Sequence, residues 1–287
     1  MNDVTHQYLD LMASQNAPRT VILYHGGFAE LLSAIFYVYQ HKLQNQPELV
    51  ILQQHHYQQG LFDECHHVEY HEQHSQRVLN KITALFGEKA IRQFLMVNAS
   101  EYPHVAMTIF KVIQYALNSQ KPQFILQDYS HPAVMDFAKI IKSMGREIHR
   151  MTAFVRFEHT KQDIYFARIE PDFDVLPFIQ SHFAKRYQDQ DWLIYDIKRG
   201  YGIFYQWQSK QLQLVDDIDA EVIDHPQQLH SEHEQRYQQF WQGYFKNVTI
   251  NERKNRRLHL QYLPKRYWKY LSEKQVLGNE SYLQKKR

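Results

Sequence analysis

Hydrophobic residues recur with different periods along this chain, and the periods predict its elements. Residues Thr20 to Tyr24 are rich in β-branched and apolar side chains and end in His25-Gly26-Gly27, after which apolar positions from Phe28 to Tyr39 repeat at helical spacing. This pattern predicts a strand, a turn and a helix. Leu49 to Gln53 predicts a short strand. The Gln- and His-rich segment from Gln53 to His74 has no sustained period and is interpreted as a connecting loop.

The remainder of the first half is predicted to be mainly helical. Prolines 103 and 132 stand near predicted helix starts, where proline is tolerated. The predicted helices cover His74 to Phe86, Glu88 to Val97, Tyr102 to Asn118 and His131 to His149.

From Met151 the pattern changes to that of strands. MTAFVRFEHT (151–160) and IYFARIE (164–170) predict a β-hairpin, and an amphipathic helix opened by Pro177 follows at Leu176 to Tyr187. The fold class is therefore α+β, with antiparallel hairpins flanking a helix in the C-terminal half. The later predictions are strands at Trp192 to Ile197 and Gly202 to Trp207, an edge strand at Leu212 to Val215, and an aromatic-rich helix at Ser231 to Phe245.

We expect one composite domain over residues 1–287. Residues 1–150 form its mainly helical part, residues 151–273 carry the sheet, its helices and a basic segment, and residues 274–287 are a polar tail.

Composition limits the protein class. The 287 residues are 44% hydrophobic and 22% charged, as in folded globular proteins. No stretch approaches the roughly 20 apolar residues of a membrane span, and the start lacks the basic and apolar regions of a secretion signal, so we expect a cytoplasmic protein. A single cysteine, Cys65, excludes an intramolecular disulfide and a cysteine-based zinc or iron–sulfur site. No cofactor is expected.

The net charge of +2 is small, but basic residues are concentrated in one tract near the C-terminus. In ERKNRRLHLQYLPKRYWKYL (252–271), arginines and lysines alternate with Tyr262, Tyr267 and Trp268. Cations at this density attract phosphate, and exposed rings can stack on unpaired bases for about 1–3 kcal/mol each. Alternatively, the rings close the core and the cations form a solvated face. An acidic stretch, Asp216 to Glu234, precedes the tract and is expected to neutralise part of it.

A second basic cluster consists of Arg146, His149, Arg150 and Arg156. Cations near a helix C-terminus are favourable in any protein, so this cluster can be a partner of the helix dipole. Arg156 alternates with Val155 and Phe157 in the predicted strand and therefore faces away from the apolar side chains. Arg156 and Arg168 then either converge on an anion or pair with Glu158 and Glu170.

Two further groups are candidates for chemistry. His182 with Arg186, near Asp196 with Lys198 and Arg199, could supply acid–base catalysis because a carboxylate fixes the tautomer of a histidine; a structural role is the alternative. Metal binding is a weaker prediction, because the candidates match no zinc spacing: Cys65, His66, His67, His71 and His74. The sequence contains no P-loop, GxGxxG, GxSxG or PCxxC motif.

Five segments together resemble one bacterial family of unknown function, described as probable DNA metabolism proteins. They are YHGGFAELLSAIFYVY (24–39), GREIHRMTAFVRF (145–157), YFARIEPDFDVLPFIQSHFAKRY (165–187), DWLIYDIKR (191–199) and NERKNRRLHLQYLPKRYWKYLSE (251–273). The resemblance implies a setting in DNA repair or modification: members are encoded beside a radical-SAM protein, and the domain also occurs fused to a uracil-DNA glycosylase-like domain. It carries over no catalytic residue, and Phe173 stands where a histidine often stands in the family.

These observations lead to three hypotheses. The first is a nucleic-acid-binding accessory protein that acts with a radical-SAM or uracil-DNA glycosylase-like partner. The second is an enzyme for a damaged or modified base, with His149, His182 and Asp196 as acid–base candidates. The third is a protein-interaction module that uses helix 235–245, although the spacing of Tyr237, Phe240, Trp241 and Phe245 favours core positions. The predicted nucleic-acid-binding residues are Arg150, Arg156, Arg186, Arg199, Arg253, Asn255, Arg256, Lys265, Arg266, Tyr267 and Trp268.

Overall fold

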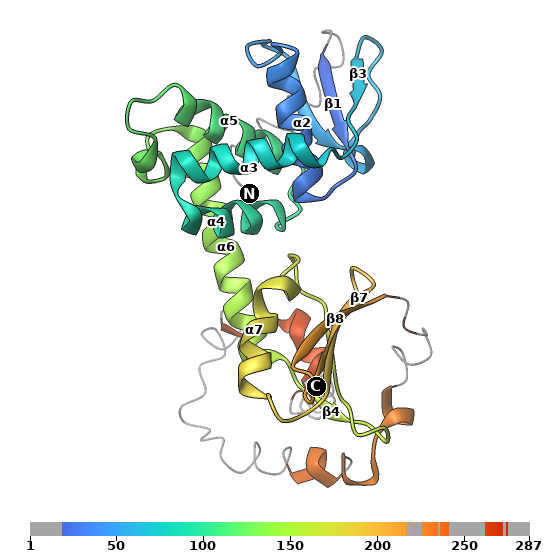
Figure 1. Ribbon diagram of the computed structural model, residues 1–287. Coiled ribbons are helices and arrows are strands. Elements are labelled where there is room, and N and C mark those ends of the chain that lie inside the picture. Colours follow the sequence, from blue (N-terminus) through green and yellow to red (C-terminus); the bar gives the residue numbers. More distant parts are fainter. Residues whose placement is uncertain are drawn as a thin grey trace, which may run out of the picture. The chain divides into compact units, whose positions relative to one another are not determined.

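The computed structural model describes residues 19–216, 218, 226–234, 236–240, 262–271 and 274. The chain divides into two compact units, Met1–Met144 and Gly145–Arg287, and the division falls within one long helix. The expectation of a single composite domain stays a prediction. Figure 1 shows the mixture of helices and strands that confirms the α+β class.

The first unit, Met1–Met144, contains a small parallel sheet with the strand order β2-β1-β3. β1 (Thr20–Tyr24) and β2 (Leu49–Gln53) have the predicted bounds, and α2 (Phe28–Gln40) connects them. β1 is the central strand and is buried along its whole length. Parallel strands need such a crossover, which explains the strand–turn–helix pattern of this segment.

The third strand, β3 (Glu64–His67), corrects the prediction of a continuous loop from Gln53 to His74. A short 3-10 helix, η1 (Gln54–His56), also lies in that segment. β3 pairs in parallel with β1 from Thr20 opposite Glu64. Its side chains are polar and mostly exposed, so the strand carries no hydrophobic alternation that the sequence could have revealed.

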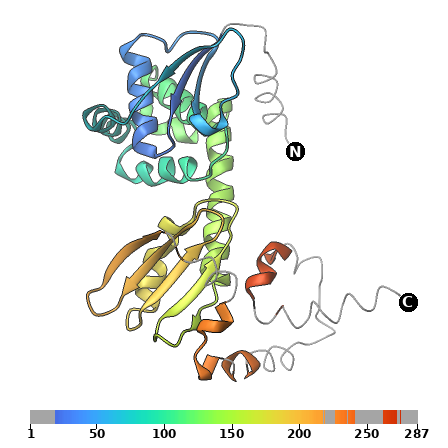
Figure 2. The ribbon, with the colours of Figure 1, turned by 90° about the vertical axis from the view of Figure 1, so that its right-hand side faces the viewer.

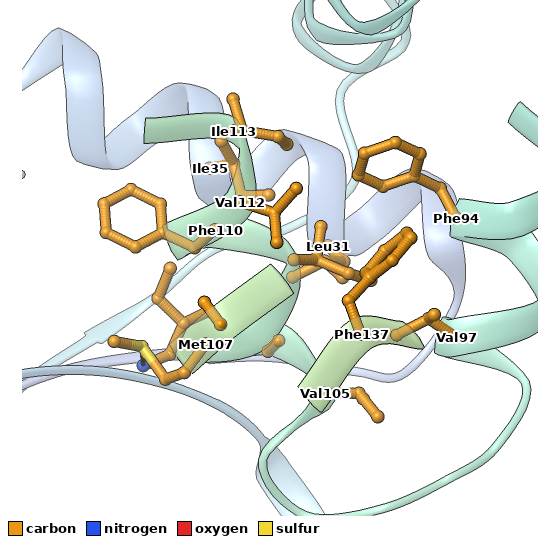
Figure 3. Packing of buried hydrophobic residues seen from close by; sticks show 14 of the residues in the cluster. Leu31, Ile35, Phe94, Val97, Val105, Met107, Phe110, Val112, Ile113 and Phe137 are labelled. Atoms are coloured by element: carbon orange, nitrogen blue, oxygen red, sulfur yellow. Dashed lines mark hydrogen bonds between the residues drawn. The ribbon is translucent and has the colours of Figure 1, made fainter. Parts of the chain in front are cut away.

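Helices form the core of this unit with one face of the sheet. They are α2, α3 (Glu72–Phe86), α4 (Glu88–Asn98), α5 (Val105–Leu117) and the beginning of α6 (Pro132–Phe154), with the 3-10 helix η2 (Pro122–Gln127) between α5 and α6. Figure 3 shows Phe94 and Phe137 beside Leu31, with α5 residues such as Val112 nearby. α5 is buried on most sides, as expected for a helix that is apolar around its circumference.

α6 is longer than the sequence pattern predicted and continues to Phe154 instead of ending at His149. Met144, Glu147 and Met151 extend its buried stripe at helical spacing. The strand predicted for residues 151–160 is therefore reduced to β4 (Glu158–His159). The placement of Arg156 within a strand is wrong, because the residue lies in the connection between α6 and β4.

The second unit, Gly145–Arg287, is built on a five-stranded sheet with the order β4-β5-β6-β7-β8. The remaining strands are β5 (Tyr165–Ile169), β6 (Trp192–Asp196), β7 (Tyr201–Gln206) and β8 (Gln211–Asp216). The hairpins β4–β5, β6–β7 and β7–β8 are antiparallel, which confirms the expected hairpins. β5 and β6 run parallel because α7 (Leu176–Arg186) crosses between them, a pairing that the sequence analysis did not anticipate.

Helix α7 covers one face of this sheet, as Figure 2 shows. Phe183 of α7 meets the Trp192 ring at a centroid distance of 6.3 Å, and Trp192 stacks on Tyr205 at 5.3 Å. The 3-10 helix η5 (Lys265–Tyr270) contacts β5. A further 3-10 helix, η3 (Pro226–Leu229), leads to residues 232–234 and 236–240, which are helical as predicted; residues 235 and 241–245 of that predicted helix lie outside the described residues.

Within the described part of the chain, the helices are all too short or too polar to cross a bilayer.

Candidate nucleic-acid interface

The described end of the basic tract, residues 262–271, has two different faces. Leu263, Tyr267 and Leu271 are buried, with 9%, 2% and 0% of their surface exposed. Tyr262, by contrast, is 66% exposed, and Lys265 and Lys269 also lie on the surface. The buried residues follow one another at intervals of four, so a single side of the segment anchors it to the protein.

The anchor is the carboxylate of Glu147 in α6, which is 2% exposed. The Tyr267 hydroxyl lies 2.6 Å from both of its oxygens, and Arg266 Nη2 lies 2.9 Å from Oε2. The backbone amide of Asp172 donates to Oε1 at 3.0 Å, and Arg150 Nη1 is 3.7 Å from Oε2. A buried carboxylate is costly unless it is paired and hydrogen-bonded, and these four groups satisfy it.

Burial, and after it the neighbouring Glu147 carboxylate, raises the pKa of Tyr267 above its usual range. The hydroxyl therefore keeps its proton and remains a donor to Glu147. A ring in this buried position is not available to stack on a base, in contrast to the role expected for Tyr267 from the sequence.

The acidic turn after β5 pairs with two cations of η5. Arg266 Nη2 forms a second ion pair, at 2.7 Å, with Asp172 Oδ2. Lys269 pairs with Glu170, whose carboxylate also accepts a hydrogen bond from the Tyr270 hydroxyl at 2.7 Å. The hydrogen bond from Lys269, and then that from Tyr270, lowers the pKa of Glu170, so this carboxylate is charged at neutral pH.

The β6–β7 turn adds a second buried carboxylate, Asp196, which is fully buried. Its Oδ2 accepts a hydrogen bond from Arg199 Nη1 at 2.7 Å, and its Oδ1 accepts backbone amides of the turn. Burial raises the pKa of Asp196, and the charge of Arg199 offsets part of this effect. Arg199 also donates to the carbonyls of Pro171 and Asp172 at 3.3 and 3.2 Å, and Lys198 Nζ donates to the Asp172 carbonyl at 3.0 Å.

One network therefore joins α6, the turn at residues 170–172, the β6–β7 turn and η5. It brings together five residues that the sequence analysis selected from three separate segments: Arg150, Asp196, Arg199, Arg266 and Tyr267. The sequence analysis missed Glu147, Asp172 and Lys269 as members of this network. Glu147 was detectable in principle, because it is a charged residue within the apolar stripe of α6.

The other candidates lie elsewhere. His149 and His182 are exposed, and within the described residues no hydrogen bond or ion pair joins either to Asp196. Arg156 Nη1 donates to the carbonyls of Ala153 and Val155, at the end of α6. Arg186 lies over the Tyr187 ring. Arg253, Asn255 and Arg256 are outside the described residues.

Arg168 Nη2 lies 3.8 Å from Glu158 Oε1, which agrees with the alternative that this arginine pairs with a carboxylate of the sheet. The half-buried Trp268 donates its indole N–H to the Leu263 carbonyl at 3.1 Å, and the ammonium of Lys274 lies 5.5 Å from its ring centroid.

The weak metal candidates are spread over β3 and the start of α3. Cys65 Sγ lies 2.9 Å from the Tyr57 hydroxyl, whereas the rings of His71 and His74 stack at 4.0 Å. Cys65 and His67 lie on β3, which precedes His71 and His74 in the chain. Within the described ranges, no three His, Cys, Asp or Glu side chains come together in a way that could hold a metal ion.

Comparison with known proteins gives a family but no function. No curated protein matches the chain. Residues 103–273 match the model of a domain of unknown function, DUF4130. The matched residues include α6, the five-stranded sheet and every residue of the network described above. Because this match covers more than half of the 287 residues, the chain belongs to the DUF4130 family.

Proposed function

We propose that this protein is a nucleic-acid-binding accessory protein of bacterial DNA repair or modification. The observation that carries the proposal is the division of the tract at residues 262–271. One side is fixed by Leu263, Tyr267 and Leu271, and the other presents Lys265, Lys269 and the exposed Tyr262 to solvent. The repair setting, and a radical-SAM or uracil-DNA glycosylase-like partner, rest on the family resemblance alone.

This surface has the components that sequence-independent binding requires. Ammonium and guanidinium groups neutralise phosphates and release counterions, which makes the affinity depend steeply on salt. An exposed ring such as Tyr262 can stack on an unpaired base for about 1–3 kcal/mol. Because η5 is anchored through Tyr267, these groups are held in place before a ligand arrives, which reduces the entropy lost on binding.

The test is fluorescence anisotropy of the full chain with labelled single-stranded DNA, duplex DNA and uracil-containing duplex, each titrated over a range of salt concentrations. We expect Lys265→Glu to weaken binding about tenfold and to reduce the salt slope by about 1, because one phosphate contact becomes a repulsion. Lys185→Glu, a charge reversal at an exposed position of α7, is the matched control and should bind like the wild type.

Absence of binding to all three ligands at low salt would contradict the proposal. Equal losses in both variants would also contradict it, because they would show only a dependence on net charge. Arg266→Glu is a poor test, since it would place a third carboxylate beside Glu147 and Asp172 and destabilise the fold.

A second candidate, docking of a protein partner, is supported by residues 236–240. Tyr237 is 67% exposed and Phe240 is 76% exposed, so the interpretation of these two residues as core is wrong. Exposed aromatic residues often anchor protein interfaces. Trp241 and Phe245 lie outside the described residues. Pull-down with a radical-SAM partner, compared between wild type and Phe240→Ser, separates this function from DNA binding.

The remaining hypothesis, an enzyme acting on a damaged or modified base, required His149, His182 and Asp196 to converge. The geometry gives no support for it, because both histidines are exposed and the Asp196 carboxylate is paired with Arg199.

A further inference from the structure

The turn that follows β5 places two carboxylates against two cations of η5. Glu170 pairs with Lys269, and Asp172 pairs with Arg266 at 2.7 Å. The acids are two residues apart in the turn, and the cations are three residues apart in η5. Two neighbouring negative groups therefore lie along the cationic side of the tract, as two successive phosphates of a nucleic-acid strand would.

Asp172 is not the group that anchors Arg266. The guanidinium already has a buried partner, because Arg266 Nη2 lies 2.9 Å from Glu147, whose side chain is 2% exposed. The side chain of Asp172 is 50% exposed. Glu147 therefore fixes Arg266 from the protein side, while Asp172 meets it from the solvent side.

Further cations surround the same turn. Lys198 Nζ and Arg199 Nη2 both donate to the backbone carbonyl of Asp172, at 3.0 and 3.2 Å. These two donors reach the backbone of the turn and not its carboxylate. An anion that replaced the Asp172 carboxylate would thus meet Arg266 of η5, next to a backbone carbonyl that already binds two cations of the β6–β7 turn.

We propose that Glu170 and Asp172 occupy the positions of two successive phosphates, and that a nucleic-acid backbone displaces them to bind Arg266 and Lys269. This inference rests on the proposed function and names its phosphate contacts. Carboxylate and phosphate oxygens accept the same charge-assisted hydrogen bonds, and arginine suits both. Exposed ion pairs contribute little to stability, so breaking these two pairs costs little free energy. The single charge of a backbone phosphate then replaces the single charge of each carboxylate.

The test uses Asp172→Asn and Glu170→Gln in the anisotropy titrations with single-stranded and duplex DNA. Each variant should bind about fivefold more tightly than the wild type, which corresponds to about 1 kcal/mol, the interaction of two unit charges about 4 Å apart in water. Asp189→Asn, which removes an exposed carboxylate from the turn between α7 and β6, is the control and should change the affinity less than twofold.

The outcomes separate this inference from the proposed function. If the wild type binds DNA and Lys265→Glu weakens it, but Asp172→Asn and Glu170→Gln bind like the wild type, the inference is wrong and the function stands. Equal tightening by Asp189→Asn would also overturn the inference, because it would reflect net charge alone. If neither the wild type nor any of the variants binds, the proposed function itself fails.

A urea titration of Asp172→Asn completes the test. We expect an unfolding midpoint close to that of the wild type, since Glu147 continues to hold Arg266 and Tyr267. A large loss of stability without a gain in affinity would show that Asp172 is a structural ion-pair partner, and would overturn the inference.

Discussion

At the scale of single residues, one buried carboxylate, that of Glu147, anchors residues 262–271 of the basic tract. Glu147 is buried in the second unit. Its hydrogen bonds come from the turn at Asp172 and from η5, and Arg150 of α6 adds an ion pair. The sequence analysis selected Arg266 and Tyr267 as nucleic-acid-binding residues. It could not show that their first partner is Glu147, because 119 residues separate Arg266 from that carboxylate.

Tyr267→Phe tests this arrangement with a minimal change. The substitution removes only the hydroxyl, so Glu147 loses a donor while buried, and we expect the free energy of unfolding to fall by about 1–3 kcal/mol. Urea unfolding followed by circular dichroism measures the change. Tyr262→Phe, at an exposed position of the same segment, is the matched control. Equal and negligible effects of the two substitutions would contradict the proposed anchor.

At the scale of elements, periodicity located most helices and strands, and tertiary packing decided their ends. The predicted and observed bounds agree for β1 and β2, and differ by about one residue for α7, β6 and β7. The end of α6 was predicted five residues too early, because Thr152, Phe154 and Val155 favour a strand by composition alone. Strand β3 was missed because hydrogen bonds to β1, and not apolar side chains, define it.

Two glycines in the second unit lead to opposite predictions for the same substitution, so each serves as the control for the other. Gly145 lies within α6, where an added Cβ would meet no atom within 4 Å, so Gly145→Ala should stabilise the protein by about 0.5–1 kcal/mol. Gly202 lies in β7, where a Cβ would come within 2.9 Å of the Ile194 carbonyl oxygen. Gly202→Ala should therefore destabilise it by about 1–3 kcal/mol. Thermal unfolding measures both, and shifts in the same direction would contradict the structure.

At the scale of the whole molecule, the prediction of one composite domain can be tested across the boundary between the units. The side chain of Asp63, in the first unit, is 2% exposed and accepts hydrogen bonds from Arg19 Nε and Nη2 at 2.8 and 2.5 Å. The hydrogen bond from Arg19 holds the pKa of Asp63 below its ordinary value of 3.8. The pair thus stabilises the folded protein above pH 3.8, and this contribution is lost as the pH falls through the lower, folded-state pKa.

All four tryptophans, Trp192, Trp207, Trp241 and Trp268, belong to the second unit. If the chain is one domain and unfolds as a whole, Asp63→Asn lowers the free energy of unfolding by about 2 kcal/mol at pH 7, as measured by tryptophan fluorescence in urea. The difference from wild type should shrink at pH values below 3.8. A midpoint that moves in circular dichroism but not in tryptophan fluorescence would show that the units unfold separately.

The sequence by itself determined the α+β class, most of the helices and the hairpins, because hydrophobic periodicity is a local property that each segment displays alone. It also indicated the tract where cations and aromatic rings gather. Only the tertiary structure decided which of those side chains face inward. Tyr267 and Tyr262 are the same residue type five positions apart, yet the first is bonded to Glu147 and the second is exposed. Burial depends on partners that are distant in the chain, and a sequence pattern does not specify them.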